Sequence, residues 1–261
     1  MEDRKAFIVG ISGASSSGKT TLARLLRDVF PNTFILHEDD FYKAETELPS
    51  KDGLLDWDCA ESISIPDMTR ALAHIRTHGT FPPFVDSKED QNSIGSCPVP
   101  DAAIAAAKSK VASWTAPGQP GHAVLARNLR VCVLDGFLLY SPELERGGVP
   151  ALLDAKLFLL VSRQRATRRR ETRDGYVTLE GFWTDPPGYV DKIVWPNYAE
   201  SHAGLFEGGD VEGRLDEGVL REKGILAQVG RGLDVDMETT FGWAVNIVMR
   251  RLEEFSREGK R

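Results

Sequence analysis

The sequence predicts an α/β fold in which a mostly parallel β-sheet carries helices on both faces. Short apolar runs alternate with segments of helical spacing along most of the 261 residues, and the first run leads through a glycine-rich loop into a helix. Strands that alternate with helices are joined by crossover connections, which place the strands parallel in one sheet. Ligands bind such sheets at the carboxyl ends of the strands. The residues that follow each strand are therefore the first candidates for function.

Five short apolar runs predict the strands, and most of them contain the β-branched residues that strands favour. The runs span 7–11, 33–36, 131–134, 156–161 and 225–229. Residue spacing predicts apolar-faced helices over 59–76 and 239–255 and a polar helix over 163–173. We expect a single domain over 1–261, with a five-stranded parallel sheet between two layers of helices.

The stretch from about 81 to 127 differs from the rest of the chain. Prolines punctuate it, with Gly, Ser and Ala between them. This composition predicts a long surface insertion with one Ala-rich helix around 102–113. We expect it to be the least ordered part of the chain.

The loop after the first run fits the phosphate-loop pattern G-x-x-x-x-G-K-[ST] at every fixed position. Such a loop points successive backbone N–H groups at one phosphate, and the helix start adds donors and a positive dipole end. Lys19 is expected to reach the β- and γ-phosphates, and the Thr20 hydroxyl to ligate Mg²⁺. The residues expected to hold the nucleotide phosphates are Gly13, Ala14, Ser15, Ser16, Ser17, Gly18, Lys19, Thr20 and Thr21.

Composition and charge narrow the classes of function. The formal net charge of −7 argues against a general nucleic-acid binder, which usually has a basic balance. Three scattered cysteines are too few for a disulfide framework or a zinc site, and no stretch is long and apolar enough to span a bilayer. We expect no nucleic-acid or membrane partner and favour a monomer. The expected compartment is intracellular: the cytoplasm, with the nucleus as a second location.

Acidic residues follow the second and third predicted strands. Phosphoryl transfer to a hydroxyl needs a carboxylate that orients the alcohol and accepts its proton, and Asp39 or Asp40 could do this. Asp135 follows four apolar residues, in a Walker-B-like arrangement, and could hold Mg²⁺ through its water shell or assist the base. The alternatives are a helix cap or a solvated turn for the first pair, and a turn cap for Asp135.

Six arginines fall within the eleven residues 163–173 of an otherwise acidic chain. Arg165, Arg169 and Arg173 share one helix face, where like charges are unfavourable unless an anion neutralises them. Polyphosphate suits the planar fork of arginine; a nucleic-acid patch and a solvated face are the alternatives. The glycine- and proline-rich stretch at about 174–190 predicts either a lid that excludes water from the transfer site or a simple connector.

Several blocks of this sequence together resemble the nicotinamide riboside kinases, in the uridine-kinase-like branch of the P-loop kinases. The matching blocks lie at 10–21, 39–43, 53–58, 135–139, 168–173, 185–189 and 194–198. The resemblance covers most of 6–80 and 130–206. It implies a P-loop nucleoside/nucleotide-kinase-like three-layer fold with a lid, ATP as the phosphate donor, and Mg²⁺.

The resemblance also implies roles for individual residues. It makes Asp39 the proton acceptor and a contact of Mg²⁺, together with Thr20. Catalysis is then assigned to Asp39, Lys19 and Asp135, although Asp135 stands where the family commonly has the longer Glu. Riboside contacts are expected from Asp39, Asp40, Phe41, Tyr42, Trp57, Asp58, Arg170 and, in the lid, Tyr176. ATP contacts are expected from Arg169 and Arg173 and, by position after the last strand, from Gly230, Arg231 and Gly232.

The expected activity is ATP-dependent phosphorylation of nicotinamide riboside to nicotinamide mononucleotide, with nicotinic acid riboside as a second candidate substrate. A kinase acting on uridine, cytidine or another small hydroxyl compound is the nearest alternative. A pyridinium cation would favour the aromatic face of Trp57 with carboxylates nearby. This preference would distinguish a nicotinamide riboside kinase from a kinase for uridine or cytidine. A non-catalytic nucleotide-binding regulator is the second alternative, but a switch would not need Asp39 as an acceptor base.

Overall fold

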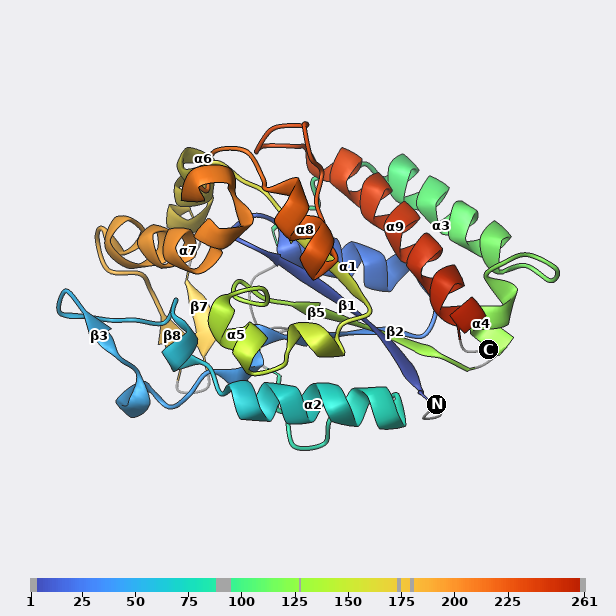
Figure 1. The fold of residues 1–261 in the computed structure, drawn as a ribbon, viewed down its shortest axis with the longest axis horizontal. Helices are drawn as coiled ribbons and strands as arrows, with labels where there is room; N and C mark the ends of the chain where they lie inside the picture. Colours follow the sequence, from blue (N-terminus) through green and yellow to red (C-terminus); the bar gives the residue numbers. More distant parts are fainter. Residues whose placement is uncertain (1–3, 88–94, 127, 173–174, 179–180, 259–261) are drawn as a thin grey trace.

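A five-stranded parallel sheet forms the centre of the molecule (Figure 1). The structure is a computed structural model that describes residues 4–87, 95–126, 128–172, 175–178 and 181–258. The strands lie in the order β2-β5-β1-β6-β9, and every neighbouring pair is parallel. They are β1 (Ala6–Gly13), β5 (Arg130–Asp135), β2 (Thr33–His37), β6 (Ala155–Leu159) and β9 (Ile225–Leu226). The predicted fold class is confirmed, although β9 is shorter than its apolar run.

One face of the sheet is buried by a long helix and several short ones. Ile8, Leu134 and Phe158 point from their strands to this face and pack with Met68 and Leu72. The covering helices are α2 (Ile65–His78), α5 (Pro142–Arg146), α7 (Trp195–His202) and α8 (Glu217–Lys223).

The opposite face is buried by three longer helices. Val9, Val133 and Leu157 pack there with Leu22 and Val248. Because successive residues of a strand point to opposite faces, neighbouring residues of β1 enter the two different clusters. The helices are α1 (Lys19–Val29), α3 (Asp101–Thr115) and α9 (Met237–Glu258), with the short α4 (His122–Ala126) beside them. Two layers of helices thus enclose the sheet, as predicted.

Helix α3 shows that the predicted insertion is better packed than its composition suggested. The Ala-rich helix is confirmed, but it is part of the core rather than a loose surface segment: Val111 and Trp114 are buried with residues of α1 and α9. The Trp114 indole N–H donates to Glu253 at 2.8 Å, and its ring meets Phe30 edge-on. The expectation of low order is therefore wrong for this helix. Within the stretch, 88–94 and 127 lie outside the described residues.

Helix α2 starts later than the sequence predicts. The predicted helix began at 59, but residues 60–62 form a separate short turn and α2 begins at Ile65. Pro66 explains the boundary, because proline fits the first turn of a helix but clashes further inside one. Among the described residues, no helix combines the length and the apolar character needed to cross a membrane.

Several small elements gather at one end of the sheet, on the left of Figure 1. They are two hairpins, a polar helix and a π-helical turn that leads directly into α7. Their bounds are β3 (Ser50–Lys51), β4 (Leu54–Leu55), α6 (Arg163–Glu171), β7 (Tyr176–Thr178), β8 (Gly181–Trp183) and η6 (Val190–Val194). The hairpin β7–β8 lies within the stretch that the sequence predicted as a lid.

Candidate active site

The phosphate loop joins the end of β1 to the start of α1, as its motif predicts. Gly13 has φ +145°, and a Cβ there would lie 2.4 Å from the carbonyl oxygen of Leu159 on the neighbouring strand. Gly18, just before α1, has φ +101°, which residues with a side chain rarely adopt. Both glycines are thus required by the path of the backbone.

Polar groups in and beside this loop are buried, and some make no hydrogen bond. Lys19 Nζ donates to the carbonyl oxygen of Ala14 at 2.9 Å. The hydroxyls of Ser12, Ser16 and Ser17 are buried and have no hydrogen-bond partner in the part of the chain that the structure describes. An unmade hydrogen bond in the interior is costly. Phosphate oxygens in this loop would provide acceptors for such donors.

His37 and Asp135 lie side by side where β2 and β5 end. They are register partners in the parallel ladder, and His37 Nδ1 lies 2.5 Å from Asp135 Oδ1, with both side chains buried. Burial alone would raise the pKa of Asp135. Charge and hydrogen bonding from His37, a hydrogen bond from the Thr20 side chain and the charge of Lys19 outweigh it and lower that pKa. Asp135 is therefore an ionised carboxylate beside the Thr20 hydroxyl.

The two candidate bases after β2 have different surroundings. The Asp40 carboxylate accepts a hydrogen bond from the backbone N–H of His37 at 3.2 Å, so it caps the short turn η1 (Glu38–Phe41). Asp39 is exposed on the same turn, and its charge raises the pKa of Glu38 and Tyr42. Asp39 is thus the more accessible of the two carboxylates.

Glu38 is a buried acid that the sequence analysis did not single out. Its side chain has no exposed surface, and Oε2 accepts hydrogen bonds from the backbone N–H groups of Phe137 and Leu138 at 2.5 and 3.0 Å. These bonds hold the turn that follows β5. Burial is the largest cause acting on its carboxyl group and raises its pKa to about 8. Glu38 is therefore mostly protonated at neutral pH.

Helix α6 brings its arginines to the phosphate loop. Ser162 caps the helix, because its hydroxyl accepts a hydrogen bond from the Arg165 backbone N–H at 3.2 Å. From the last turn of α6, Arg169 Nη1 donates to the carbonyl oxygen of Ser16 at 3.1 Å. A positive side chain thus lies directly beside the loop.

Arg170 joins the loop to two further segments. Its Nη1 donates to Ser15 Oγ at 2.9 Å, and Nη1 and Nη2 donate to the two carboxylate oxygens of Asp58 at 2.8 and 3.1 Å. Nε and Nη2 donate to the two oxygens of Asp185 at 2.6 and 3.1 Å. Burial raises the pKa of Asp58 despite the opposing charge of Arg170. One buried guanidinium therefore connects the loop, the Trp57–Asp58 segment and the segment after β8.

An aromatic cluster lies beside Asp58. The Trp57 ring meets Tyr42 edge-on with centroids 5.1 Å apart and lies tilted against Trp183 at 5.6 Å. Trp183 meets Tyr189 at 5.8 Å, and Phe137 stacks on Tyr42 at 6.4 Å. The Trp57 indole N–H is buried and has no partner among the described residues. Ring faces next to carboxylates suit a flat cationic ligand that offers a hydrogen-bond acceptor.

The segment that carries Trp57 and Asp58 is held by residues far along the chain. The Tyr189 hydroxyl accepts from the Trp57 backbone N–H and donates to the Leu55 carbonyl oxygen, both at 3.0 Å. The Asn197 amide donates to both carboxylate oxygens of Asp56 at 2.8 Å. The sequence blocks around 53–58, 185–189 and 194–198 are therefore joined in one packed unit beside Arg170.

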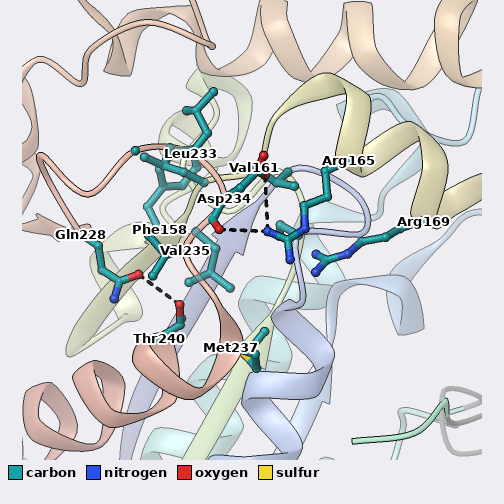
Figure 2. A pocket seen from close by; sticks show the side chains of 14 residues that line it. Phe158, Val161, Arg165, Arg169, Gln228, Leu233, Asp234, Val235, Met237 and Thr240 are labelled. Atoms are coloured by element: carbon teal, nitrogen blue, oxygen red, sulfur yellow. Dashed lines mark hydrogen bonds and ion pairs between the residues drawn. The ribbon is translucent and has the colours of Figure 1, made fainter. Parts of the chain in front are cut away.

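A pocket lies between α6, the end of β6 and the segment that leads into α9 (Figure 2). Arg165 Nη1 donates to the Asp234 carbonyl oxygen at 2.9 Å, and the Thr240 hydroxyl to Gln228 at 3.1 Å. Of the three glycine-segment residues expected to contact the nucleotide base, Gly232 lines this pocket, whereas Gly230 and Arg231 are not among its lining residues. Lining residues that sequence reasoning missed include Gln228, Leu233, Asp234, Val235, Met237 and Thr240.

Three other predicted site residues, Phe41, Arg173 and Tyr176, lie in the core or partly or wholly outside the described part of the chain. Phe41 is 4% exposed and packs in the core, where it anchors η1. Arg173 lies outside the described residues. Tyr176 pairs with Trp183 through the backbone of the hairpin, and its side chain is outside the described part. Trp183 is the residue that sequence reasoning missed here; its only signal was an aromatic side chain in a Gly- and Pro-rich stretch.

The oxygen donors near the loop fit a small hard cation. The Thr20 hydroxyl is hydrogen-bonded to the Asp135 carboxylate, and the exposed Asp39 follows the neighbouring strand. In the described ranges, no three His, Cys, Asp or Glu side chains gather as a metal site of their own. Mg²⁺ keeps waters and takes substrate phosphates together with one or two protein oxygens, so this donor set suits a cation that arrives with a nucleotide.

Comparisons with known proteins agree with this geometry. A family model described as chloramphenicol phosphotransferase-like protein matches residues 6–77. Nicotinamide riboside kinase of Schizosaccharomyces pombe is 38% identical over 250 residues, which cover 96% of this chain and 99% of that protein. The Saccharomyces cerevisiae protein of the same name is 33% identical over 83% of this chain and 85% of its own length.

More distant similarities extend beyond the yeasts. Nicotinamide riboside kinase 1 of Homo sapiens is 29% identical over 74% of this chain and 75% of its own length. Among solved structures, a putative fructose transport system kinase from Silicibacter sp. TM1040 aligns with 63% of this chain and 70% of its own, at 18% identity and a TM-score of 0.39.

Proposed function

This chain belongs to the nicotinamide riboside kinase family, and on that premise we propose that it transfers the γ-phosphate of ATP to the 5′-hydroxyl of nicotinamide riboside. The product is nicotinamide mononucleotide, so the reaction is a step in NAD salvage. Nicotinic acid riboside is a second candidate substrate for the same pocket.

The observation that carries this proposal is the position of Arg170. One guanidinium contacts the phosphate loop through Ser15 and the pocket carboxylate Asp58 at the same time. The phosphate-binding loop and the segment proposed to bind the acceptor are therefore joined through one side chain. A kinase for a small alcohol needs this arrangement, because the donor phosphate and the acceptor hydroxyl must lie in line and close together.

The pocket chemistry favours a nicotinamide ring as the acceptor's base. A pyridinium is flat and cationic, and Trp57, Tyr42 and Trp183 offer aromatic ring edges and faces beside a buried carboxylate. A cation next to an aromatic face is stabilised by the quadrupole of the ring. We assign the ribose hydroxyls to Asp58 and Arg170, and the lid side of the ring to Trp183, which meets Trp57, in preference to Tyr176.

Asp39 is the proposed general base, which orients the 5′-hydroxyl and accepts its proton. Lys19, Arg169 and Arg173 balance the charge that develops on the transferred phosphoryl group. Thr20 and Asp39 would hold Mg²⁺, with Asp135 beside them. An ion held there would supply positive charge that neutralises the phosphates. The hairpin β7–β8 closes the pocket against water, which would otherwise compete as acceptor.

The direct test is an acceptor panel followed by mass spectrometry. The protein is incubated with Mg-ATP and, separately, with nicotinamide riboside, nicotinic acid riboside, uridine and cytidine, and each acceptor is checked for an added phosphate. We expect nicotinamide riboside to be phosphorylated and uridine to remain unchanged. A parallel series with Mg-GTP defines the donor.

Asp39→Asn is the control for this panel. It keeps the size of the side chain but cannot accept the proton, so turnover should fall by a factor of about 10²–10⁴ while ATP binding is retained. Phosphorylation of uridine but not of nicotinamide riboside would identify a sister kinase. ATP binding with no acceptor phosphorylated would identify a nucleotide-binding regulator instead.

A further inference from the structure

The buried His37–Asp135 pair lies where the sheet meets the phosphate loop. His37 ends β2, Asp135 ends β5, and the Thr20 hydroxyl from α1 bonds to the same carboxylate. In the 2.5 Å contact between His37 Nδ1 and Asp135 Oδ1, we assign the ring N–H as the donor and the carboxylate oxygen as the acceptor, the usual arrangement of an imidazole beside a carboxylate.

A purely structural role does not account for the pair. β2 and β5 are already joined by a ladder that runs from Thr33 opposite Val131 to His37 opposite Asp135. The turn after β5 is also held independently, because Glu38 accepts the N–H groups of Phe137 and Leu138. What the imidazole adds is control over where the Asp135 carboxylate points.

We propose that His37 is a positioning residue that holds the Asp135 carboxylate against the Thr20 hydroxyl, and so prepares the nucleotide-bound Mg²⁺ site. This inference rests on the proposed use of Mg-ATP but not on the identity of the acceptor. Aspartate is short, and its carboxyl group can rotate about χ2. His37 on one side and Thr20 on the other limit that rotation before any ion arrives.

The arrangement resembles the outer shell of many metal sites, in which a ring N–H fixes the orientation of a carboxylate. With Asp135 fixed, the Thr20 hydroxyl directs its hydrogen to the carboxylate, and the lone pairs of its oxygen are left for the ion. Loss of the Nδ1 donor frees the carboxylate and with it the Thr20 hydroxyl. The expected cost falls on the affinity that Mg²⁺ adds to nucleotide binding, and much less on nucleotide binding without the ion.

Two substitutions of similar size separate positioning from packing. His37→Asn places an amide N–H close to the position of Nδ1, whereas His37→Gln carries its amide one bond further out, toward the position of Nε2. Both remove the ring, so both remove its packing. Only His37→Asn can restore the hydrogen bond to Asp135.

The test measures ADP affinity by calorimetry with Mg²⁺ and with EDTA, for the full-length wild-type chain and both variants. We expect the Mg²⁺-dependent gain in affinity to fall by about tenfold or more in His37→Gln and to be largely retained in His37→Asn. The affinity for ADP in EDTA should change little in either variant.

Three outcomes decide the proposal. An unchanged Mg²⁺-dependent gain in His37→Gln, or an equal loss of that gain in both variants, overturns it. If both variants unfold at a similarly lower temperature but keep the Mg²⁺-dependent gain in ADP affinity, the His37–Asp135 pair has a structural role only. Because ADP binding needs no acceptor, failure of the acceptor assay would leave this result interpretable.

Discussion

At the scale of single residues, three consecutive acids after β2 do three different things because their surroundings differ. Glu38 is buried and holds the turn after β5. Asp39 is exposed at the mouth of the site. Asp40 caps the turn that contains all three. In the sequence the three carboxylates look alike. Only their burial and backbone contacts distinguish Glu38 as a protonated anchor, Asp39 as a candidate base and Asp40 as a cap.

Glu38 makes stability fall as pH rises. The pKa of its carboxyl group is about 8 in the folded protein and about 4.5 when exposed. The folded state therefore binds more protons between these values, and this contribution is present below the lower pKa and lost as pH rises through the higher one. Glu38→Gln keeps a carbonyl acceptor but cannot ionise. From about pH 6 to pH 8.5, wild type should lose about 2 kcal/mol of unfolding free energy relative to Glu38→Gln.

Denaturant unfolding of both proteins at a series of pH values measures this difference. His202, whose pKa burial lowers to about 4, acts in the opposite direction below its ordinary value, but it is common to both proteins and cancels. Parallel curves for wild type and variant across the whole range would show that Glu38 is ionised throughout.

At the scale of elements, the two faces of strand β8 in the hairpin β7–β8 have different surroundings. Trp183 in β8 contacts Trp57 and Tyr189, and its indole N–H donates to Asp185 at 3.0 Å. The neighbouring Phe182 is 64% exposed, because successive side chains of a strand point in opposite directions. Within β8, Trp183 therefore faces Trp57 and Tyr189, whereas Phe182 faces solvent.

This asymmetry supplies a matched pair of variants. Trp183→Ala removes a ring from the pocket, and the loss of its aromatic and cation–π contacts should raise the KM for nicotinamide riboside by about tenfold. The KM for ATP should stay within about twofold, because the nucleotide pocket is lined by other residues. Phe182→Ala is the control and should leave both constants near wild type. Equal effects of the two variants would mean that the hairpin does not bind the riboside by this face.

The sequence predicted best those parts of the site whose residues are contiguous in the chain. The phosphate loop, its strand and its helix are contiguous, so their spacing alone defined them. The family resemblance placed Asp58 and Arg170 in one riboside site. Their direct ion pair and the part of Asp185 in it were not predictable, because Asp58 and Arg170 lie 112 positions apart and Asp185 lies beyond β8. His37 and Asp135 became neighbours through strand order, which alternation of strands and helices does not specify.

Two other differences have local causes. The packing of α3 was hidden because alanines dilute its apolar face, so that only Val111 and Trp114 are large and buried. The lid contact was predicted at Tyr176, whose side chain lies outside the described part of the chain. The hairpin places Trp183, the register partner of Tyr176, against Trp57.

At the scale of the whole molecule, the inserted helix α3 contributes to the core on the face away from the aromatic cluster (Figure 1). It packs on α1, which starts at the phosphate loop, and on α9. Trp114 is its main anchor: it is 8% exposed, bonded to Glu253 and in edge contact with Phe30. Trp114 thus stabilises the face of the sheet opposite the aromatic cluster.

Trp114→Ala should therefore lower stability while sparing catalysis. Removing a buried tryptophan costs about 3 kcal/mol or more, which denaturant unfolding would detect as a lower midpoint. Well below that midpoint, kcat for the phosphorylation reaction should stay within about twofold of wild type. Trp114→Phe, which keeps most of the buried ring but loses the bond to Glu253, should lie between the two in stability. A large fall in kcat for Trp114→Ala would show that α3 also adjusts the phosphate loop through α1.

Arg170 has a consequence for how the two substrates affect each other's binding. Its guanidinium is shared by Ser15 on the donor side, Asp58 on the acceptor side and Asp185 beyond β8. A ligand that engages any one of these groups changes the free energy of the other two contacts. Thermodynamic linkage makes such an effect reciprocal: if bound nucleotide alters the affinity for the riboside, the riboside alters the affinity for nucleotide by the same factor. A single arginine would thereby couple the binding of one substrate to the binding of the other.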